Sequence, residues 1–113
     1  MKTQPIAVLI YEAHYDAAGN DWDNLNDEYI IIRNFGGTAV SLTGWQLVDL
    51  VGHTFTFPEF SLNPGGTVTV YTGSGINTAT ALYWGSGNPI WNNDHDTAYL
   101  YDQNMNLIDE KSL

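Results

Sequence analysis

The sequence contains no cysteine among its 113 residues, so it has no disulfide, no zinc-thiolate centre and no cysteine nucleophile. It has only three Lys or Arg residues against 13 Asp and Glu, which gives a formal net charge of −10. This balance opposes nucleic acids, which are bound mainly by Lys and Arg at the phosphates, and it opposes anionic membranes. We therefore expect no nucleic-acid partner and no direct membrane insertion. The same charge suits divalent cations.

Long apolar runs are also missing. None approaches the roughly 20 residues of a membrane-spanning helix. Residues 6–11 are apolar but too short for the core of a signal peptide, and no small-residue cleavage site follows them. The length is that of one domain. We interpret residues 1–113 as a single, monomeric domain of a longer surface or secreted protein, while a cytoplasmic location stays open.

Helical periodicity is absent, because no window places apolar residues at positions i, i+3, i+4 and i+7 between capping residues. Strand-like segments recur instead, separated by Gly, Asn, Pro and Asp. We predict an all-β sandwich of about eight strands. The predicted segments are 6–15, 28–34, 39–42 (a short strand or bend), 45–50, 54–57, 67–72, 82–84, 97–102 and 107–109.

The segment 28–34 carries large apolar residues on both faces. Glu28, Ile30, Ile32 and Asn34 share one face by alternation, and Tyr29, Ile31 and Arg33 share the other. A strand with apolar groups on both faces is typical of the centre of a sheet, so we expect this strand to be central.

Several motifs follow one another in a specific order along most of the chain. They are Asn26-Asp27-Glu28-Tyr29-Ile30-Ile31-Ile32-Arg33-Asn34, Leu42-Thr43-Gly44-Trp45-Gln46-Leu47, Thr54-Phe55-Thr56-Phe57-Pro58, Leu62-Asn63-Pro64-Gly65-Gly66, Thr72-Gly73-Ser74-Gly75, Leu82-Tyr83-Trp84, Trp91-Asn92-Asn93 and Asp96-Thr97-Ala98. In this order the chain resembles a lamin-tail domain, and the last two motifs resemble the prokaryotic branch of that family. The resemblance implies an immunoglobulin-like sandwich that is usually non-catalytic and often part of surface or secreted proteins.

An acidic loop precedes the strand predicted at 28–34. It alternates carboxylates with amides, and calcium prefers six to eight such oxygen ligands. The candidate ligands are Asp16, Asn20, Asp21, Asp23, Asn26 and Glu28. The order does not match an EF-hand, which needs a glycine at position six and a glutamate at position twelve. The alternative is a solvated loop whose Asp and Asn side chains form turns.

Glu28 poses a separate question, because an inward carboxylate at the start of a strand needs a partner. Either it accepts hydrogen bonds from backbone N–H groups or it binds a cation. A second polar cluster, residues 92–96, either shares an ion with the acidic loop or forms a simple turn.

Catalytic signals are weak. His14, His53 and His95 lack the spacing of a zinc site, and no serine lies in a nucleophile-elbow motif. We predict no enzyme activity and no catalytic residue. Trp22, Trp84 and Trp91 are the candidates for a carbohydrate platform, although Trp84 and Trp91 match core positions of the family that the chain resembles.

These observations favour a non-catalytic adhesion or targeting module that binds a protein or glycan partner, with calcium as its one candidate cofactor. The alternatives are a carbohydrate-binding module that uses Trp22 and an intracellular protein-interaction domain.

Overall fold

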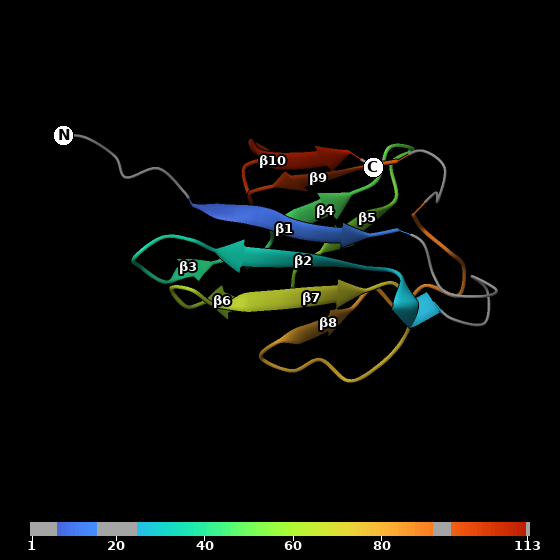
Figure 1. The fold of residues 1–113 in the computed structure, drawn as a ribbon, viewed down its shortest axis with the longest axis horizontal. Coiled ribbons are helices and arrows are strands. Elements are labelled where there is room, and N and C mark those ends of the chain that lie inside the picture. Colours follow the sequence, from blue (N-terminus) through green and yellow to red (C-terminus); the bar gives the residue numbers. More distant parts are fainter. Residues whose placement is uncertain (1–6, 16–24, 92–95, 113) are drawn as a thin grey trace.

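The computed structural model describes residues 7–15, 25–91 and 96–112, and in these ranges the chain is all-β with no α-helix. Its strands form two four-stranded sheets and a small two-stranded ribbon (Figure 1). The elements are β1 (Val8–His14), the 3₁₀ turn η1 (Leu25–Asp27), β2 (Tyr29–Asn34), β3 (Val40–Ser41), β4 (Gln46–Val48), β5 (Thr54–Thr56), β6 (Ser61–Leu62), β7 (Thr67–Tyr71), β8 (Ala81–Tyr83), β9 (Thr97–Tyr101) and β10 (Leu107–Ser112). The predicted β-sandwich is confirmed.

The first sheet has the order β1-β2-β7-β8, and β2 lies at its centre, as the sequence predicts. Ile30 and Ile32 are fully buried and lie opposite Val70 and Val68 of β7. Tyr29, Ile31 and Arg33 are half-buried on the outer face. Strand β1 pairs with β2 across a bulge between Ile10 and Glu12, which shifts the register by one residue.

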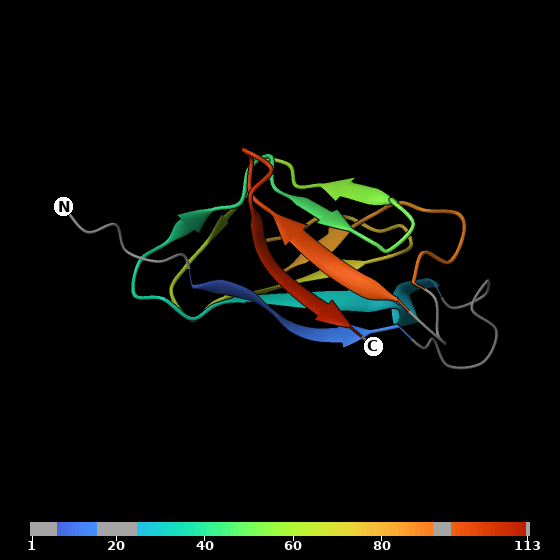
Figure 2. The same ribbon diagram turned by 90° about the horizontal axis from the view of Figure 1, so that it is seen from above.

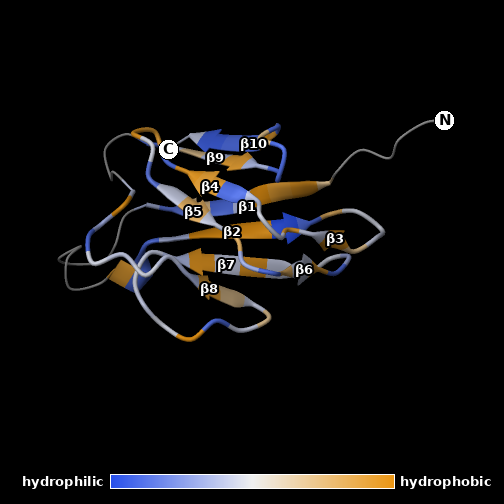
Figure 3. Ribbon diagram, turned by 180° about the vertical axis from the view of Figure 1, so that it is seen from behind, coloured by the Kyte–Doolittle hydropathy of each residue, from blue (hydrophilic) through white to orange (hydrophobic). Residues whose placement is uncertain are grey.

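The second sheet has the order β10-β9-β4-β5. The predicted hairpin of β4 and β5 is present, and its inward residues Trp45, Leu47 and Asp49 are buried together. Figure 2 shows the two sheets as separate layers, with β1 and β2 in one and β4, β9 and β10 in the other. The core lies between the layers, where the apolar residues of β2, β7, β4 and β9 gather (Figure 3).

One side of the sandwich is closed by contacts between β1 and β10. The Ile10 N–H donates to Asp109 Oδ2 at 2.8 Å, and the Tyr15 hydroxyl donates to the Lys111 carbonyl at 2.7 Å. Burial raises the pKa of Tyr15 to about 12, against the opposing effect of a backbone hydrogen bond with Ala98, and the charge of Asp96 adds to the rise. The edge strands on this side are therefore tied to each other.

The free edge of β8 is covered by the loop that leads into it. The Tyr83 N–H donates to the Asn77 side chain, and the Thr78 N–H donates to the Ala81 carbonyl. The Tyr83 N–H and the Ala81 carbonyl, backbone groups that could pair with a further strand, are thus already hydrogen-bonded. This protects the edge from pairing with another chain.

The sequence analysis missed two local elements. Residues 61–62 form β6 and pair with β3. Residues 25–27 form η1. Both are too short to leave a periodic pattern. The motif Leu62–Gly66 predicts a turn, and the structure has one within it: the Gly66 N–H donates to the Asn63 carbonyl, and Gly65 has a φ of 74°.

Among the described residues, no helix is long and apolar enough to cross a membrane.

The turn between β9 and β10 places a non-glycine residue in the left-handed region. Met105 has a φ of 63° and is exposed. Asp102 fixes the turn, since its Oδ1 accepts hydrogen bonds from the backbone N–H groups of Asn104 and Asn106, each at 2.9 Å. Hydrogen bonding, chiefly from Asn106, lowers the pKa of Asp102. The Asp102 side chain thus holds Met105 in a backbone conformation that L-residues rarely adopt.

Met105→Gly is expected to raise the free energy of unfolding by about 1 kcal/mol, because glycine adopts a positive φ without the steric cost. Chemical denaturation checks this. Asn104→Gly, at an exposed neighbour without a positive φ, is the control and should give no gain. Equal stabilisation by both substitutions would contradict the account.

Candidate functional site

The carboxylate of Glu28 is fully buried at the end of the sandwich where η1 meets β2. Its Oε1 accepts three hydrogen bonds: from the Ile90 N–H at 2.8 Å, the Trp91 N–H at 2.9 Å and the Thr72 hydroxyl at 3.0 Å. Two of the donors belong to a loop more than sixty residues away in sequence. The backbone-bonding alternative for Glu28 is confirmed.

Asn34 does similar work at the opposite end of β2. Its amide Nδ2 donates to the carbonyls of Thr38 and Leu62, and its Oδ1 accepts from the Gly36 N–H at 2.9 Å. The two buried polar residues share the inward face of β2, as the alternation predicts. Each ties irregular backbone to the central strand.

The two polar segments singled out in the sequence leave the sandwich at neighbouring points. Tyr15, the residue before 16–24, stacks on Trp91, the residue before 92–95, with ring centroids 5.3 Å apart. On the far side of the second segment, Asp96 is buried and its Oδ1 accepts from the backbone N–H groups of Leu50 and Thr97. The described residues that directly precede the two segments, Tyr15 and Trp91, therefore lie side by side.

Most of the predicted calcium ligands lie outside the described residues, namely Asp16, Asn20, Asp21 and Asp23. Asn26 is exposed in η1, and its Nδ2 donates to the Ser74 carbonyl at 3.1 Å. Within the part of the chain that the structure describes, no three His, Cys, Asp or Glu side chains are grouped so that they could hold a metal ion. The calcium site stays a prediction.

The described histidines have structural partners. His53 is exposed in the β4–β5 turn, and its Nδ1 lies 2.6 Å from Oδ2 of the buried Asp49. His14 ends β1, donates its Nδ1 hydrogen to the Asp27 carbonyl and stacks on Tyr29. His95 lies outside the described residues.

The tryptophans that the structure describes belong to the core. Trp45 and Trp91 are each 2% exposed, and Trp84 packs edge-on against Trp91. Trp84 also contacts Phe55 of the opposite sheet. Trp45 and Trp91 therefore offer no free ring face for sugar stacking. Trp22, the other candidate, lies outside the described residues, so a glycan partner there stays a prediction.

The outer face of the first sheet carries a row of rings that the sequence analysis did not identify. His14, Tyr29, Tyr71 and Tyr83 are register partners across β1, β2, β7 and β8, and we call them the tyrosine row. Neighbouring ring centroids lie 4.8, 5.8 and 5.2 Å apart. The loop after β7 covers the end of the row, because a Cβ atom on Gly75 would overlap the Tyr83 ring.

The geometry of this row decides what it can bind. Two of its three contacts are stacked, so each of the four rings turns one face toward a neighbour. Ring faces used in this way are not available for sugar stacking, and tyrosine, which joins an apolar ring to a polar hydroxyl, is enriched at protein interfaces. Burial, followed by the charges of Glu12 and Asp27 and a hydrogen bond with the Glu12 side chain, raises the pKa of Tyr29.

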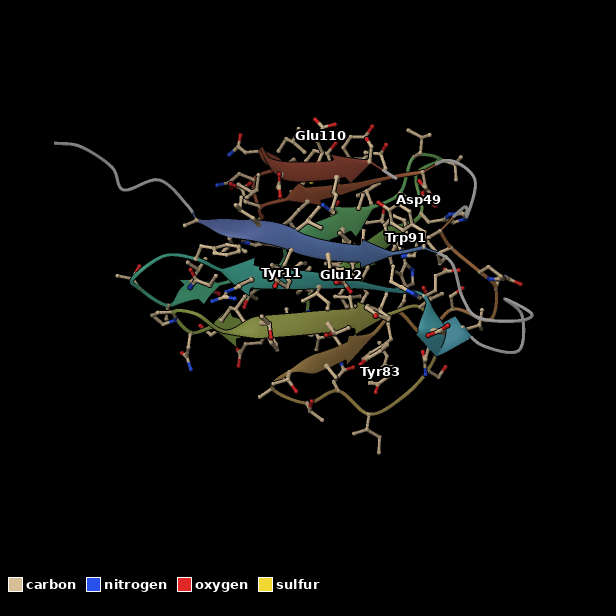
Figure 4. All side chains as sticks on the ribbon, in the orientation of Figure 1. Tyr11, Glu12, Asp49, Tyr83, Trp91 and Glu110 are labelled. Atoms are coloured by element: carbon tan, nitrogen blue, oxygen red, sulfur yellow. The ribbon has the colours of Figure 1, made fainter. Side chains whose placement is uncertain are left out.

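A second group of outward side chains lies beside this row on β1 and the end of β2. It consists of the exposed Leu9, Tyr11, Glu12 and Phe35 around the half-buried Arg33, and we call it the arginine patch. The Arg33 guanidinium carbon lies 4.9 Å from the Phe35 ring centroid and 5.8 Å from that of Tyr11. Figure 4 shows Tyr11, Glu12 and Tyr83 on the same side of the sheet.

The sequence did not predict the tyrosine row or the arginine patch, because both depend on how the strands pair. Alternation assigns Tyr29, Ile31 and Arg33 to a common face, but the partners of that face come from strands whose pairing the sequence does not state. The bulge in β1 also places Tyr11 and Glu12 at successive exposed positions.

Glu28→Ala is expected to lower the free energy of unfolding by about 3 kcal/mol or more, because it leaves three buried donors without their acceptor. Glu28→Gln should cost clearly less, since its amide oxygen can still accept. Urea denaturation measures both, with the exposed Glu59→Ala as the matched control. Equal losses for the two Glu28 variants, or a loss no greater than that of the control, would argue against the anchor.

Comparison with known proteins identifies the family. No curated protein matches the sequence. The family model described as Lamin Tail Domain matches residues 2–112, which is nearly the whole chain. This agrees with the order of motifs, the two-layer sandwich and the buried positions of Trp45 and Trp91. The chain belongs to the lamin tail domain family.

Proposed function

We propose that this domain is a non-catalytic protein-interaction module, used for adhesion or targeting, and that it binds through the outer face of the β1-β2-β7-β8 sheet. Domains of its family are immunoglobulin-like, typically non-catalytic and protein-interacting. The observation that carries the proposal is the composition of this face. It holds the tyrosine row and the arginine patch, whereas Glu12 is the one carboxylate on its strands.

This composition stands out because the chain as a whole is strongly acidic. The cores of protein interfaces are depleted of charged residues and enriched in Tyr, Phe and Arg. Truncating such residues at an interface usually costs the most binding energy. A face that avoids acids in a chain of net charge −10 therefore has the composition of an interface.

Cross-linking from two matched positions tests the choice of face. A photoreactive residue replaces either Ile31, half-buried on the proposed face, or Val48, half-buried on the outer face of the other sheet. In the cells that produce the protein, position 31 is expected to yield a discrete cross-linked species and position 48 none. Equal yields from the two positions, or a product from position 48 alone, would contradict the proposal.

The charge and the family support a proposal for the wider setting. We propose that the domain is part of a surface or secreted prokaryotic protein, in which a large negative charge keeps it away from nucleic acid and anionic lipid. An intracellular interaction domain is the alternative, and it would use the same face.

A structural calcium ion is a second part of the proposal. The ligands would come from Asp16, Asn20, Asp21, Asp23 and Asn26 of the predicted set, because Glu28, its sixth member, already accepts backbone hydrogen bonds. The stacking of Tyr15 on Trp91 supports the ion, because these two residues directly precede the two polar segments and lie side by side. An ion bound there would offset repulsion among their carboxylates.

Calcium is expected to raise the melting temperature by an amount that grows with the logarithm of its excess over the dissociation constant, because it binds the native state alone. The shift should vanish with chelator and in Asp21→Ala, and it should persist in Glu59→Ala. A melting temperature that is the same with calcium and with chelator would eliminate the ion.

A further inference from the structure

We propose that the arginine patch is a self-association surface, at which Arg33 of one copy meets Glu12 of a second copy across a two-fold axis. The proposal rests on the proposed function and names the partner of its binding face. The proposal depends on two charged groups within one apolar patch: the Arg33 guanidinium, which packs on two aromatic rings, and the exposed Glu12 carboxylate.

Arg33 is held ready for a partner but has none within the described chain. The rings of Tyr11 and Phe35 flank its guanidinium, and its Nε is buried without a hydrogen-bond acceptor. Among the described residues, no carboxylate forms an ion pair with it. A guanidinium fixed between rings loses little freedom when it binds a carboxylate.

The carboxylate is already present on the same face. Glu12 is exposed on β1, lies opposite Ile31 and hydrogen-bonds the Tyr29 side chain, while Leu9 lies opposite Arg33. Glu12 and Arg33 are therefore diagonal neighbours on the β1–β2 ladder, because Ile31, the partner of Glu12, lies two residues before Arg33. A two-fold axis between them brings each Arg33 against the partner copy's Glu12 and packs the two Tyr11 rings against each other.

The apolar part of the patch fits an interface. Tyr11 is 52% exposed, Phe35 is 50% exposed and Leu9 is 38% exposed. These three are close together, whereas the exposed Leu50 and Val51 lie in the β4–β5 turn of the other sheet. Tyr, Phe and Arg flanked by a neutralising charge pair are typical of interface hot spots.

Charge favours a second copy at this place. The chain has three cations, and Lys111 lies on β10 in the other sheet while Lys2 lies outside the described residues. The arginine patch, with one cation and one anion, is thus a surface on which two acidic copies can meet without facing like charges. Elsewhere the net charge of −10 repels a second copy.

This balance predicts an unusual salt dependence. At about 0.01 M salt the screening length is roughly 30 Å, so repulsion between the two whole chains opposes association. At about 0.5 M salt the screening length is only a few Å, so the long-range repulsion is screened and the contacts within the patch determine whether two copies associate. The monomer expected from the sequence should hold at low salt and give way to a dimer at high salt.

Sedimentation equilibrium at about 0.5 mM protein tests the proposal, since a small interface associates weakly. The wild type should be monomeric at low salt and substantially dimeric at high salt. Arg33→Glu or Glu12→Arg alone should abolish the dimer, because each reversal sets like charges against each other twice. The double variant, with the two charges exchanged, should restore it.

Matched controls keep the result specific. Lys111→Glu changes the net charge as Arg33→Glu does, and Glu110→Arg changes it as Glu12→Arg does; both controls should still dimerise. A melting curve confirms that each variant folds, and Glu12 is exposed enough that its reversal should not unfold the domain.

A wild type that stays monomeric at high salt would overturn self-association, as would single reversals that dimerise like the controls. A folded double variant that fails to dimerise would also overturn it. None of these results bears on cross-linking to a different protein from position 31, so the proposed function is judged separately. A cross-linked product of twice the chain mass supports the second copy, and a product of another mass contradicts it.

Discussion

The buried carboxylate of Glu28 is the interaction on which one end of this sandwich depends. A single oxygen collects donors from β7's end and from the loop that leads to Trp91. Burying a carboxylate is costly unless hydrogen bonds satisfy it, so the three donors and the acceptor require one another. Because Trp91 stacks on Tyr15 and meets Trp84, fixing its backbone also fixes the aromatic contacts around it.

The same device recurs wherever irregular backbone must be held. Asn34 binds the turn after β2, Asp49 binds the β4–β5 turn, Asp96 binds Leu50, and Asp102 binds the β9–β10 turn. Glu28 and Asp96, which the sequence singles out as possible ion ligands, are thus structural acceptors for backbone N–H groups. On the described strands of the first sheet, Glu12 is the one acid and Arg33 the one Lys or Arg, so the outer face is nearly neutral, and that face is the best candidate for binding.

The sequence predicts the layers of this fold well and its surfaces poorly. Alternation along 28–34 correctly placed Glu28, Ile30, Ile32 and Asn34 inward, and the motif Asn63–Gly66 correctly marked a turn. The inward position of Glu28 followed from period-two geometry, but its donors at Ile90 and Trp91 did not, because a contact across sixty residues leaves no local pattern. The tyrosine row needed the strand order β1-β2-β7-β8, and the arginine patch needed the bulge in β1.

The most direct test of the Glu28 anchor is amide hydrogen exchange at Ile90 and Trp91, measured with calcium chelated. Both residues lie outside any strand, so ordinary loop amides would exchange quickly. If Glu28 holds them, their protection should approach that of the central β2 amides. Exchange as fast as that of the exposed Gly87 in the same loop would contradict the account.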